Sequence, residues 1–381
     1  MKIIFTGDLF LGGDLSNKDC TNIIFSETFH KADIRIVNLE QPVSDIHEIV
    51  TGKSAIIYSD SSAIQRLNQL NITSVNLAQN HIHDKTDKGI IDTIRNLDTG
   101  EIGHFGAGEN IIAAKEPYWI TDIICVCGYC ECGSIYTNTQ PAGENTPGVN
   151  PLIYDTIIED LNRIPLGKKA ILFFHWGREH VWLPPYDDIL LAKRLLDDDR
   201  VLLIVGMHCH RIQGYIEHHG KRAYMSLGNF LFPNFFMKPQ AQIAYPDNIP
   251  DTYPITRKYH RVHKLTYKKW HLVNRISLIL EYDSQNFKIR HIPIIQDDKS
   301  PYVKELHGIG KMAVLSWIYI LNLLYRFPEW IYMPLEKLNA FLADKIRVVY
   351  IMQFRVREMG IFYCGKVLFL KIIGKRQKNN I

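Results

Sequence analysis

Five short apolar runs, each followed by a polar or glycine-containing turn, constrain the fold of this chain most. Amphipathic segments with apolar residues at threes and fours lie between strands, for example 88–98 and 187–199. This alternation predicts an α/β domain in which helices cover a buried sheet. The five expected strands are 2–7 ("KIIFTG"), 34–40 ("IRIVNLE"), 72–80 ("ITSVNLAQN"), 169–177 ("KAILFFHWG") and 201–208 ("VLLIVGMH").

A strand pair extends this domain to about residue 300. In residues 275–295 alternating apolar side chains flank a "DSQN" turn. Residues 237–270, rich in Pro, Tyr, Lys and His, are expected to form a long loop or insertion. With 381 residues, 46% of them hydrophobic, the chain can bury a large core as one domain or two. We expect one domain over 1–300 and a separate extension over 301–381.

The cysteines and the N-terminus indicate the compartment. Seven cysteines, an odd number scattered along the chain, are not typical of a disulfide framework and favour a reducing environment. The opening "MKIIFTGDLF" has no long apolar core and no cleavage site, so no signal peptide is expected. The uncharged stretch 312–325 has 14 residues, fewer than the roughly 20 that a transmembrane helix needs. We expect a cytoplasmic protein, at most peripheral on the inner face of the membrane.

Side chains that can bind metal ions follow the five strands. In such sheets ligands bind beyond the carboxyl ends of the strands, so these turns are expected to converge. Taken singly, these residues are more often caps, turn residues or core histidines. Together their carboxylates, amide oxygen and imidazoles suit Zn, Mn or Fe, whereas Ca and Mg prefer oxygen ligands. The residues are Asp8, Glu40, Asn80, His81, His175, His208 and His210.

The motif "GMHCH" places two of these histidines in one extended segment. Residues i and i+2 of such a segment point to the same side, so His208 and His210 are expected to face one cavity while Cys209 points away. Gly206 would allow close approach of the backbone, and Gly214 would allow the chain to turn.

Seven ordered motifs make the chain resemble a known family. "TGDLFLGG", "NLEQP", "AQNHIHDKTDKGI", "GAGEN", "HWGREH", "VGMHCHRIQG" and "YMSLGNFLF" occur in the order seen in the bacterial capsule synthesis (CapA) family, which is similar to the calcineurin-like metallophosphoesterases. The likeness covers residues 1 to about 236 closely and the strand pair to about 296 loosely. It implies a metallophosphatase-like sandwich of two mixed β-sheets flanked by helices, with a metal centre at the strand ends.

The resemblance also implies roles for the ligands. Two ions would share Glu40 as a bridging carboxylate, with Asp8 and His210 on the first ion and Asn80, His175 and His208 on the second. A bridged pair of ions generates hydroxide near neutral pH and neutralises charge on a phosphoryl oxygen.

His81 looks like the catalytic histidine that contacts the substrate and protonates the leaving group in such phosphoesterases. One residue departs from their pattern, because Phe10 in "DLF" stands where they place a histidine ligand. Members of the capsule family share this lack. The first site would therefore be weaker or empty, and one or two divalent transition-metal ions (Mn, Fe or Zn) are expected.

Six further residues are expected around the centre. They are Asp84, Glu179 and His180, as partners that orient ligand imidazoles; Arg178 and Arg211, as groups that bind substrate anions or as solvated surface residues; and Asn229, as a substrate contact or part of a buried turn.

The segment "CVCGYCECG" offers a second possible metal site. Cys125, Cys127, Cys130 and Cys132 lie within eight residues. Structural zinc sites usually pair two such units across a longer spacer. The spacing directly after "ITDII" favours instead a buried strand that uses cysteine as a small apolar residue.

The C-terminal part carries the basic character of the chain. Residues 302–381 contain 13 Lys and Arg against 5 Asp and Glu, whereas the first 301 residues contain 31 against 35. Their apolar and aromatic-rich stretches predict helices. Three roles remain open: a cap on the domain, an amphipathic segment on anionic lipid, or a docking surface for a capsule-assembly partner. Nucleic acid fits less well, since no binding module accompanies the charge.

Two functions follow from these expectations. The first is a metal-dependent hydrolase of phosphoesterase type that acts on an anionic or polymer-precursor substrate in capsular or extracellular polymer synthesis, of the poly-gamma-glutamate or polysaccharide kind. The alternative is a non-catalytic metal-binding accessory protein of a capsule synthesis or export complex.

Overall fold

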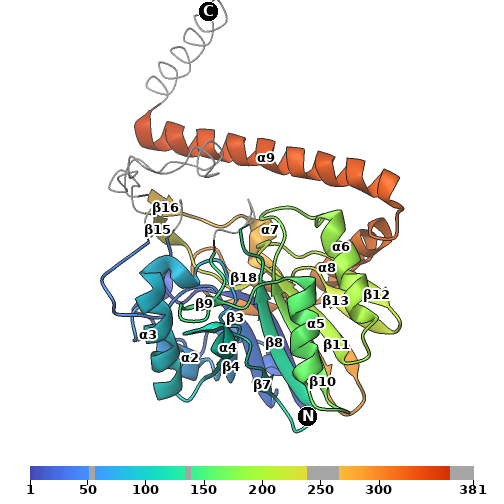
Figure 1. Ribbon diagram of the computed structural model, residues 1–381. Coiled ribbons are helices and arrows are strands. Elements are labelled where there is room, and N and C mark those ends of the chain that lie inside the picture. The colour runs from blue at the N-terminus through green and yellow to red at the C-terminus, as the bar shows by residue number, and fades with distance from the viewer. Residues whose placement is uncertain (51–55, 134–138, 238–265, 361–381) are drawn as a thin grey trace, which may run out of the picture.

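The computed structural model describes residues 1–50, 56–133, 139–237 and 266–360. Two β-sheets lie against each other and helices cover their outer faces (Figure 1). This is the expected sandwich of two mixed sheets flanked by helices, with a helical C-terminal region. Of the expected insertion at 237–270, residues 238–265 lie outside the described residues, as do residues 361–381 of the basic extension.

The first sheet has the strand order β2-β19-β18-β17-β1-β3-β4-β5, with β14 pairing beside β1. Its strands are β1 (Lys2–Leu9), β2 (Ile24–Phe25), β3 (Ile34–Leu39), β4 (Ser74–Asn76), β5 (Gly103–Phe105), β14 (Asn229–Leu231), β17 (Ile276–Asp283), β18 (Lys288–Gln296) and β19 (Val303–Glu305). Because β19 still belongs to this sheet, we propose that the extension starts after it.

The second sheet has the order β12-β13-β11-β10-β8-β7. Its strands are β7 (Tyr118–Trp119), β8 (Ile124–Cys130), β10 (Lys169–His175), β11 (Val201–Met207), β12 (Tyr215–His218) and β13 (Lys221–Tyr224). Two small pairs add β6 (Ala107–Gly108) with β9 (Gly148–Val149), and β15 (Phe235–Met237) with β16 (Thr266–Lys268).

The helical segments lie mostly between strands. They are η1 (Gly13–Leu15), α1 (Glu27–His30), α2 (Ala63–Gln69), η2 (Ile82–Lys85), α3 (Thr86–Thr99), α4 (Ile111–Ala114), α5 (Tyr154–Arg163), α6 (Tyr186–Leu196), α7 (Leu272–Arg275), α8 (Gly308–Leu324) and α9 (Glu329–Met359). The five expected strands, the strand pair and the helices near 88–98 and 187–199 are confirmed as elements, although β4 and β11 are shorter than expected. The expectation that His208 and His210 share one extended segment is wrong, because both follow the end of β11 and have positive φ angles, of 87° and 56°.

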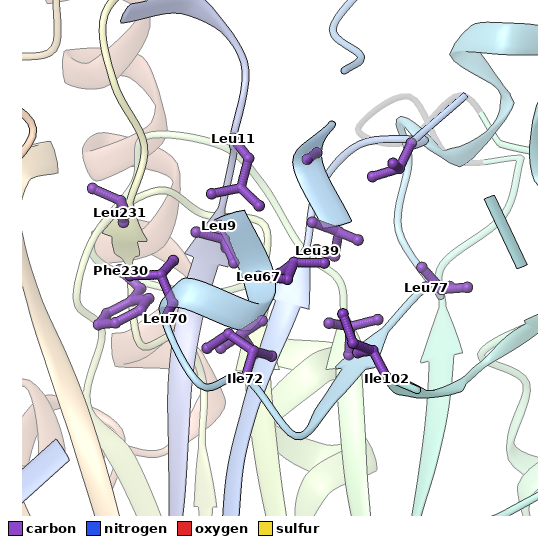
Figure 2. Close-up of a cluster of buried hydrophobic side chains, with 14 of the residues drawn as sticks. Leu9, Leu11, Leu39, Leu67, Leu70, Ile72, Leu77, Ile102, Phe230 and Leu231 are labelled. Carbon is purple, nitrogen blue, oxygen red and sulfur yellow. The ribbon is translucent and has the colours of Figure 1, made fainter. Parts of the chain in front are cut away.

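Alternation along the strands produces three buried layers, because successive strand residues face opposite sides. Phe5 of β1 lies in the core between the sheets, with its ring 6.0 Å from that of Phe173 of β10. The outer face of the first sheet packs against α2 and α3, and Figure 2 shows Leu67 of α2 over Leu9 and Leu39 at the strand ends. The outer face of the second sheet packs against α5 and α6.

Two expectations about small residues are confirmed. Cys125, Cys127 and Cys130 are buried in β8, as expected of a strand that uses cysteine as an apolar residue. Gly206 allows close packing, since a Cβ there would lie 2.2 Å from Met225 O.

The C-terminal helices pack on the second sheet. In α8, Asn322 Oδ1 accepts a hydrogen bond from Tyr215 N (2.7 Å), and Tyr325 Oη, just after the helix, accepts one from Gly214 N (2.9 Å). Helix α9 runs across the end of the molecule at which β15, β16 and α7 lie (Figure 1). Within the described ranges, neither of these helices nor any other combines the length and apolar character needed to span a bilayer.

The close pairing of β1 with β14 requires a glycine at position 7. A Cβ there would lie 1.6 Å from Gly228 O, which belongs to the backbone and has little room to shift. We expect Gly7→Ala to lower the free energy of unfolding by about 2–3 kcal/mol, measured by chemical denaturation. The matched control is Gly310→Ala in α8, where a Cβ would meet only the Leu306 side chain at 3.5 Å. It should be neutral or stabilise by up to about 1 kcal/mol. Equal effects would contradict the argument.

Candidate metal centre

The expected ligands come together where strands of both sheets end. All six are buried: Asp8 in β1, Glu40 after β3, Asn80 after β4, His175 at the end of β10, and His208 and His210 after β11. Their ligand atoms fall into two groups that share Glu40. One contains Glu40, His175 and His208 and the other contains Asp8, Glu40 and His210, with the ligand atoms of each group within 4.8 Å of one another.

The group around His175 has the donor geometry of an ion site. His175 Nε2 lies 2.9 Å from His208 Nδ1 and 3.1 Å from Asn80 Oδ1. Neighbouring ligands on one transition-metal ion, with bonds of about 2.1 Å, stand about 3 Å apart. Burial lowers the pKa of His208 to about 4, against the opposing charges of Glu179 and Asp8. The imidazole is therefore neutral near pH 7 and keeps a lone pair for an ion.

The group around His210 is more highly charged. His210 Nδ1 lies 3.4 Å from Asp8 Oδ2, and His210 Nε2 lies 3.5 Å from Glu40 Oε1. Burial alone would lower the pKa of His210, but Glu40 and Asp8 outweigh it and raise it to about 9. Without an ion the imidazolium balances the carboxylates, and a bound cation would replace that positive charge.

Asn229 orients His210. Its Oδ1 lies 2.8 Å from His210 Nδ1, and its backbone pairs with Asp8 where β14 joins β1. When Nδ1–H of His210 donates to Asn229, the other ring nitrogen, Nε2, faces Glu40. The structure thus brings Asn229 to a ligand imidazole, whereas the sequence suggests a substrate contact or a turn.

His81 and Asp84 form a buried pair next to the ligands. His81 Nδ1 lies 2.6 Å from Asp84 Oδ2, which also accepts a hydrogen bond from Ile57 N (2.7 Å). On the other side of the ring, His81 Nε2 lies 4.0 Å from Glu40 Oε1. Asp84 thus holds the ring of His81, not that of a metal-ligand candidate, with Nε2 of His81 towards the centre.

A family model for the bacterial capsule synthesis protein PGA_cap matches residues 2–234, more than half of the chain. The chain belongs to this family. PGA_cap proteins belong to the metallophosphoesterase-like superfamily.

Three curated relatives each share 25% identity with the chain. The capsule biosynthesis protein CapA of Bacillus anthracis matches 61% of this chain and 60% of its own length. The PGA biosynthesis protein CapA of Bacillus subtilis (strain 168) matches 60% and 62%. A protein of Mycobacterium tuberculosis named "Probable polyglutamine synthesis accessory protein" matches 43% and 47%. The chain therefore spans about 60% of the length of the first two relatives.

Two asparagines that sequence reasoning missed contact the candidate ligands Asp8 and His175, directly or through each other. Asn38 Nδ2 donates to Asp8 Oδ1 (2.8 Å) and lies 3.3 Å from His175 Nδ1. Asn76 Nδ2 donates to Asn38 Oδ1 (2.8 Å). Their signal was a polar residue inside an apolar strand, in "VNL" at 37–39 and again at 75–77.

Phe10 lies in a buried aromatic cluster with Phe232, Phe235 and Trp270. Its ring is 5.2 Å from Phe232 and 5.6 Å from Phe235. The ring of His210 packs against the same cluster, 5.1 Å from Trp270. An aromatic side chain that packs in this cluster thus stands where phosphoesterases place a histidine ligand. Within the described ranges His210 is the one imidazole in the group with Asp8.

Glu179 and His180 lie beside the centre in the loop after β10. Burial would raise the pKa of Glu179, but His180, His208 and His210 lower it to about 2. Burial lowers the pKa of His180 well below its usual value, and its Nδ1 lies 3.3 Å from Asn274 Nδ2. Glu179 is therefore a carboxylate next to three imidazoles.

The two arginines have different environments. Arg178 Nη2 contacts Asp344 Oδ2 of α9 at 2.7 Å. Arg211 is buried, with its guanidinium 4.8 Å from the centre of the Trp182 ring. Arg211 is therefore not a solvated surface residue, which was one of its two expected roles. Arg178 connects α9 to the loop that carries Glu179.

The two ligand groups predict different effects of removing one histidine. We expect metal-replete protein to hold between one and two ions per chain, measured by elemental analysis. His208→Ala should remove roughly one ion, because it takes away a nitrogen of the His175 group. His210→Ala should leave only the ion of that group. His104→Ala, a change in β5, is the control and should keep the wild-type content. An unchanged content in both site variants would refute the ligand assignment.

Proposed function

We propose that this PGA_cap protein is a metal-dependent hydrolase of phosphoesterase type that acts in the synthesis of a capsular or extracellular polymer. The observation that carries the proposal is the presence of two ligand groups that share Glu40, with His81 facing them. Bound ions would supply hydroxide near neutral pH and neutralise charge on a phosphoryl oxygen. Asp8, Glu40, Asn80, His175, His208 and His210 would hold them.

His81 would serve as the general acid. Because Asp84 accepts the hydrogen bond from Nδ1, Nε2 is the nitrogen that meets a substrate. Nε2 of His81 lies 4.0 Å from Glu40 Oε1 and therefore faces the two ligand groups. A proton held there would pass to the leaving oxygen as its bond to phosphorus breaks.

The surroundings favour an anionic substrate. Asn80 contributes a neutral oxygen, which limits the negative charge of the ligand set. Lys268 Nζ lies 4.1 Å from the centre of the Trp270 ring, and that ring packs against His210. Arg211, which follows His210 directly in the chain, is buried. A phosphoryl group or a polymer carboxylate would meet positive charge on this side.

The polymer is inferred from the relatives. The names of the two Bacillus proteins refer to capsule and PGA biosynthesis, and that of the mycobacterial protein to polyglutamine synthesis. A precursor or product of a poly-gamma-glutamate type polymer is therefore the proposed substrate class.

A non-catalytic accessory role is the second candidate. Phe10 in the aromatic cluster favours it, because the first ligand group lacks the imidazole that phosphoesterases place there. The word "accessory" in the name of the mycobacterial relative agrees with it. The protein would then keep the fold and an ion to bind a polymer precursor.

Replacing His81 separates the two candidates, because the proposal gives it proton transfer and not metal binding. We expect His81→Asn to retain its ions and to lower hydrolysis of a generic phosphodiester such as bis-p-nitrophenyl phosphate by about a hundredfold or more. Elemental analysis and steady-state kinetics measure both effects. His83→Asn is the matched control, since it changes a neighbouring histidine whose Nδ1 contacts Thr139. If His81→Asn hydrolyses the phosphodiester at the wild-type rate, or if cells that carry this variant produce polymer at the wild-type level, the accessory role is favoured.

A further inference from the structure

Helix α8 turns an uncharged apolar face away from the domain. Ile318 and Leu321 are buried against the sheets. On the opposite side Ile309 is 87% exposed, Met312 68% and Tyr319 62%. Residues three and four apart share one face of a helix, so these side chains form a stripe that continues through Ile320 and Leu323. Lys311 is the one charged residue between 308 and 324.

Helix α9 contacts the domain through both apolar and polar side chains. Tyr332 is fully buried, and Leu335 packs against the core on the outer face of the second sheet. Polar side chains also hold the helix to the domain: Asn339 Oδ1 accepts from Trp182 N (3.0 Å), and Glu336 Oε2 accepts from Tyr186 N (3.1 Å). Other apolar side chains of α9 are exposed and are not covered by the domain. Those exposed are Trp330, at 76%, and Leu338, Phe341, Leu342, Ile346 and Val349.

Such a surface is costly in water. Soluble proteins rarely expose contiguous apolar patches of more than a few hundred Å², and larger ones mark interaction sites. The contacts of α9 with the domain leave its exposed apolar residues available for something outside the domain. Both helices therefore present surface that the protein itself does not cover within the described residues.

We propose that α8 and α9 form a docking surface for an anionic lipid bilayer. The basic charge selects this occupant: residues 302–381 carry 13 Lys and Arg against 5 Asp and Glu. Lys337 and Lys345 lie on α9 between its exposed apolar residues. Apolar residues buried at the headgroup boundary, combined with Lys and Arg, are typical of interfacial helices.

The same charge disfavours a second copy of the chain, since two like-charged surfaces would repel each other. The helices would lie on the bilayer and not cross it, because neither meets the length and apolar requirements of a transmembrane helix. The contact of Arg178 with Asp344 joins α9 to the loop after β10. Docking would therefore place the candidate metal centre close to the lipid surface, whether or not the centre is catalytic.

Vesicle binding by the full chain tests this proposal. Wild-type protein is mixed with phosphatidylglycerol–phosphatidylcholine vesicles and with pure phosphatidylcholine vesicles, and the bound fraction is measured by sedimentation. The stripe variant is Ile309→Gln/Met312→Gln/Ile320→Gln. The matched control, Ile112→Gln/Ile153→Gln/Leu166→Gln, changes three exposed aliphatic residues around α4 and α5. Thermal unfolding checks that both variants remain folded.

We expect the wild type and the control to bind the anionic vesicles, and the stripe variant to bind at least about tenfold more weakly. Binding to neutral vesicles should be weaker, and added salt should lower binding to the anionic ones. Three results would each overturn the proposal. These are failure of the wild type to bind, equal binding by the stripe variant, and a wild-type dimer without vesicle affinity that the stripe variant converts to monomer.

Discussion

The centre depends on the parallel register of four neighbouring strands of the first sheet. Asp8 pairs with Asn38 across β1 and β3, Asn38 pairs with Asn76 across β3 and β4, and Asp8 pairs with Asn229 of β14. One row of polar side chains thus crosses an otherwise apolar sheet at the level where the strands end. Because a shift by one residue would turn each of them to the other face, this register is a condition for the centre to exist.

The row gives three of its buried side chains defined hydrogen-bond partners. A carboxylate without partners is very costly in an apolar interior. Here Asn38 donates to Asp8, Asn76 donates to Asn38, and the backbone amide of Ala78 donates to Asn76. Rigid amide contacts of this kind fix the orientation of Asp8 before any ion arrives, which lowers the entropy lost on binding.

Much of this arrangement was predictable, because it follows from short-range patterns. Apolar runs ending in polar turns gave the five strands, and the rule that ligands bind at carboxyl ends gave the convergence of the ligand candidates. Asn38 and Asn76 were not predicted because their partners come from other strands and depend on register. The same holds for Arg178, whose contact with Asp344 spans 166 positions of the sequence.

The orientation of the C-terminal helices was also beyond the sequence. Periodicity shows that α9 is amphipathic, but not which face meets the domain. Hydrogen bonds from the backbone amides of Trp182 and Tyr186 to side chains of α9, together with the buried Tyr332, place one face of the helix against the domain. Trp182 lies in the loop before α6 and Tyr186 is the first residue of that helix, and no local pattern in α9 reveals these donors.

Charge balance explains why the two ligand groups should differ in their response to an ion. In the group with His175 the donors are neutral apart from Glu40, and burial keeps His208 uncharged. In the group with Asp8, two carboxylates hold His210 as an imidazolium, because their charge outweighs the cost of burial. An ion entering there must displace a proton, and the cluster of Phe10 supplies no second imidazole to offset that cost. The affinity for an ion should therefore be lower in the group with Asp8 and His210 than in the group with His175 and His208, although the group with Asp8 carries more negative charge.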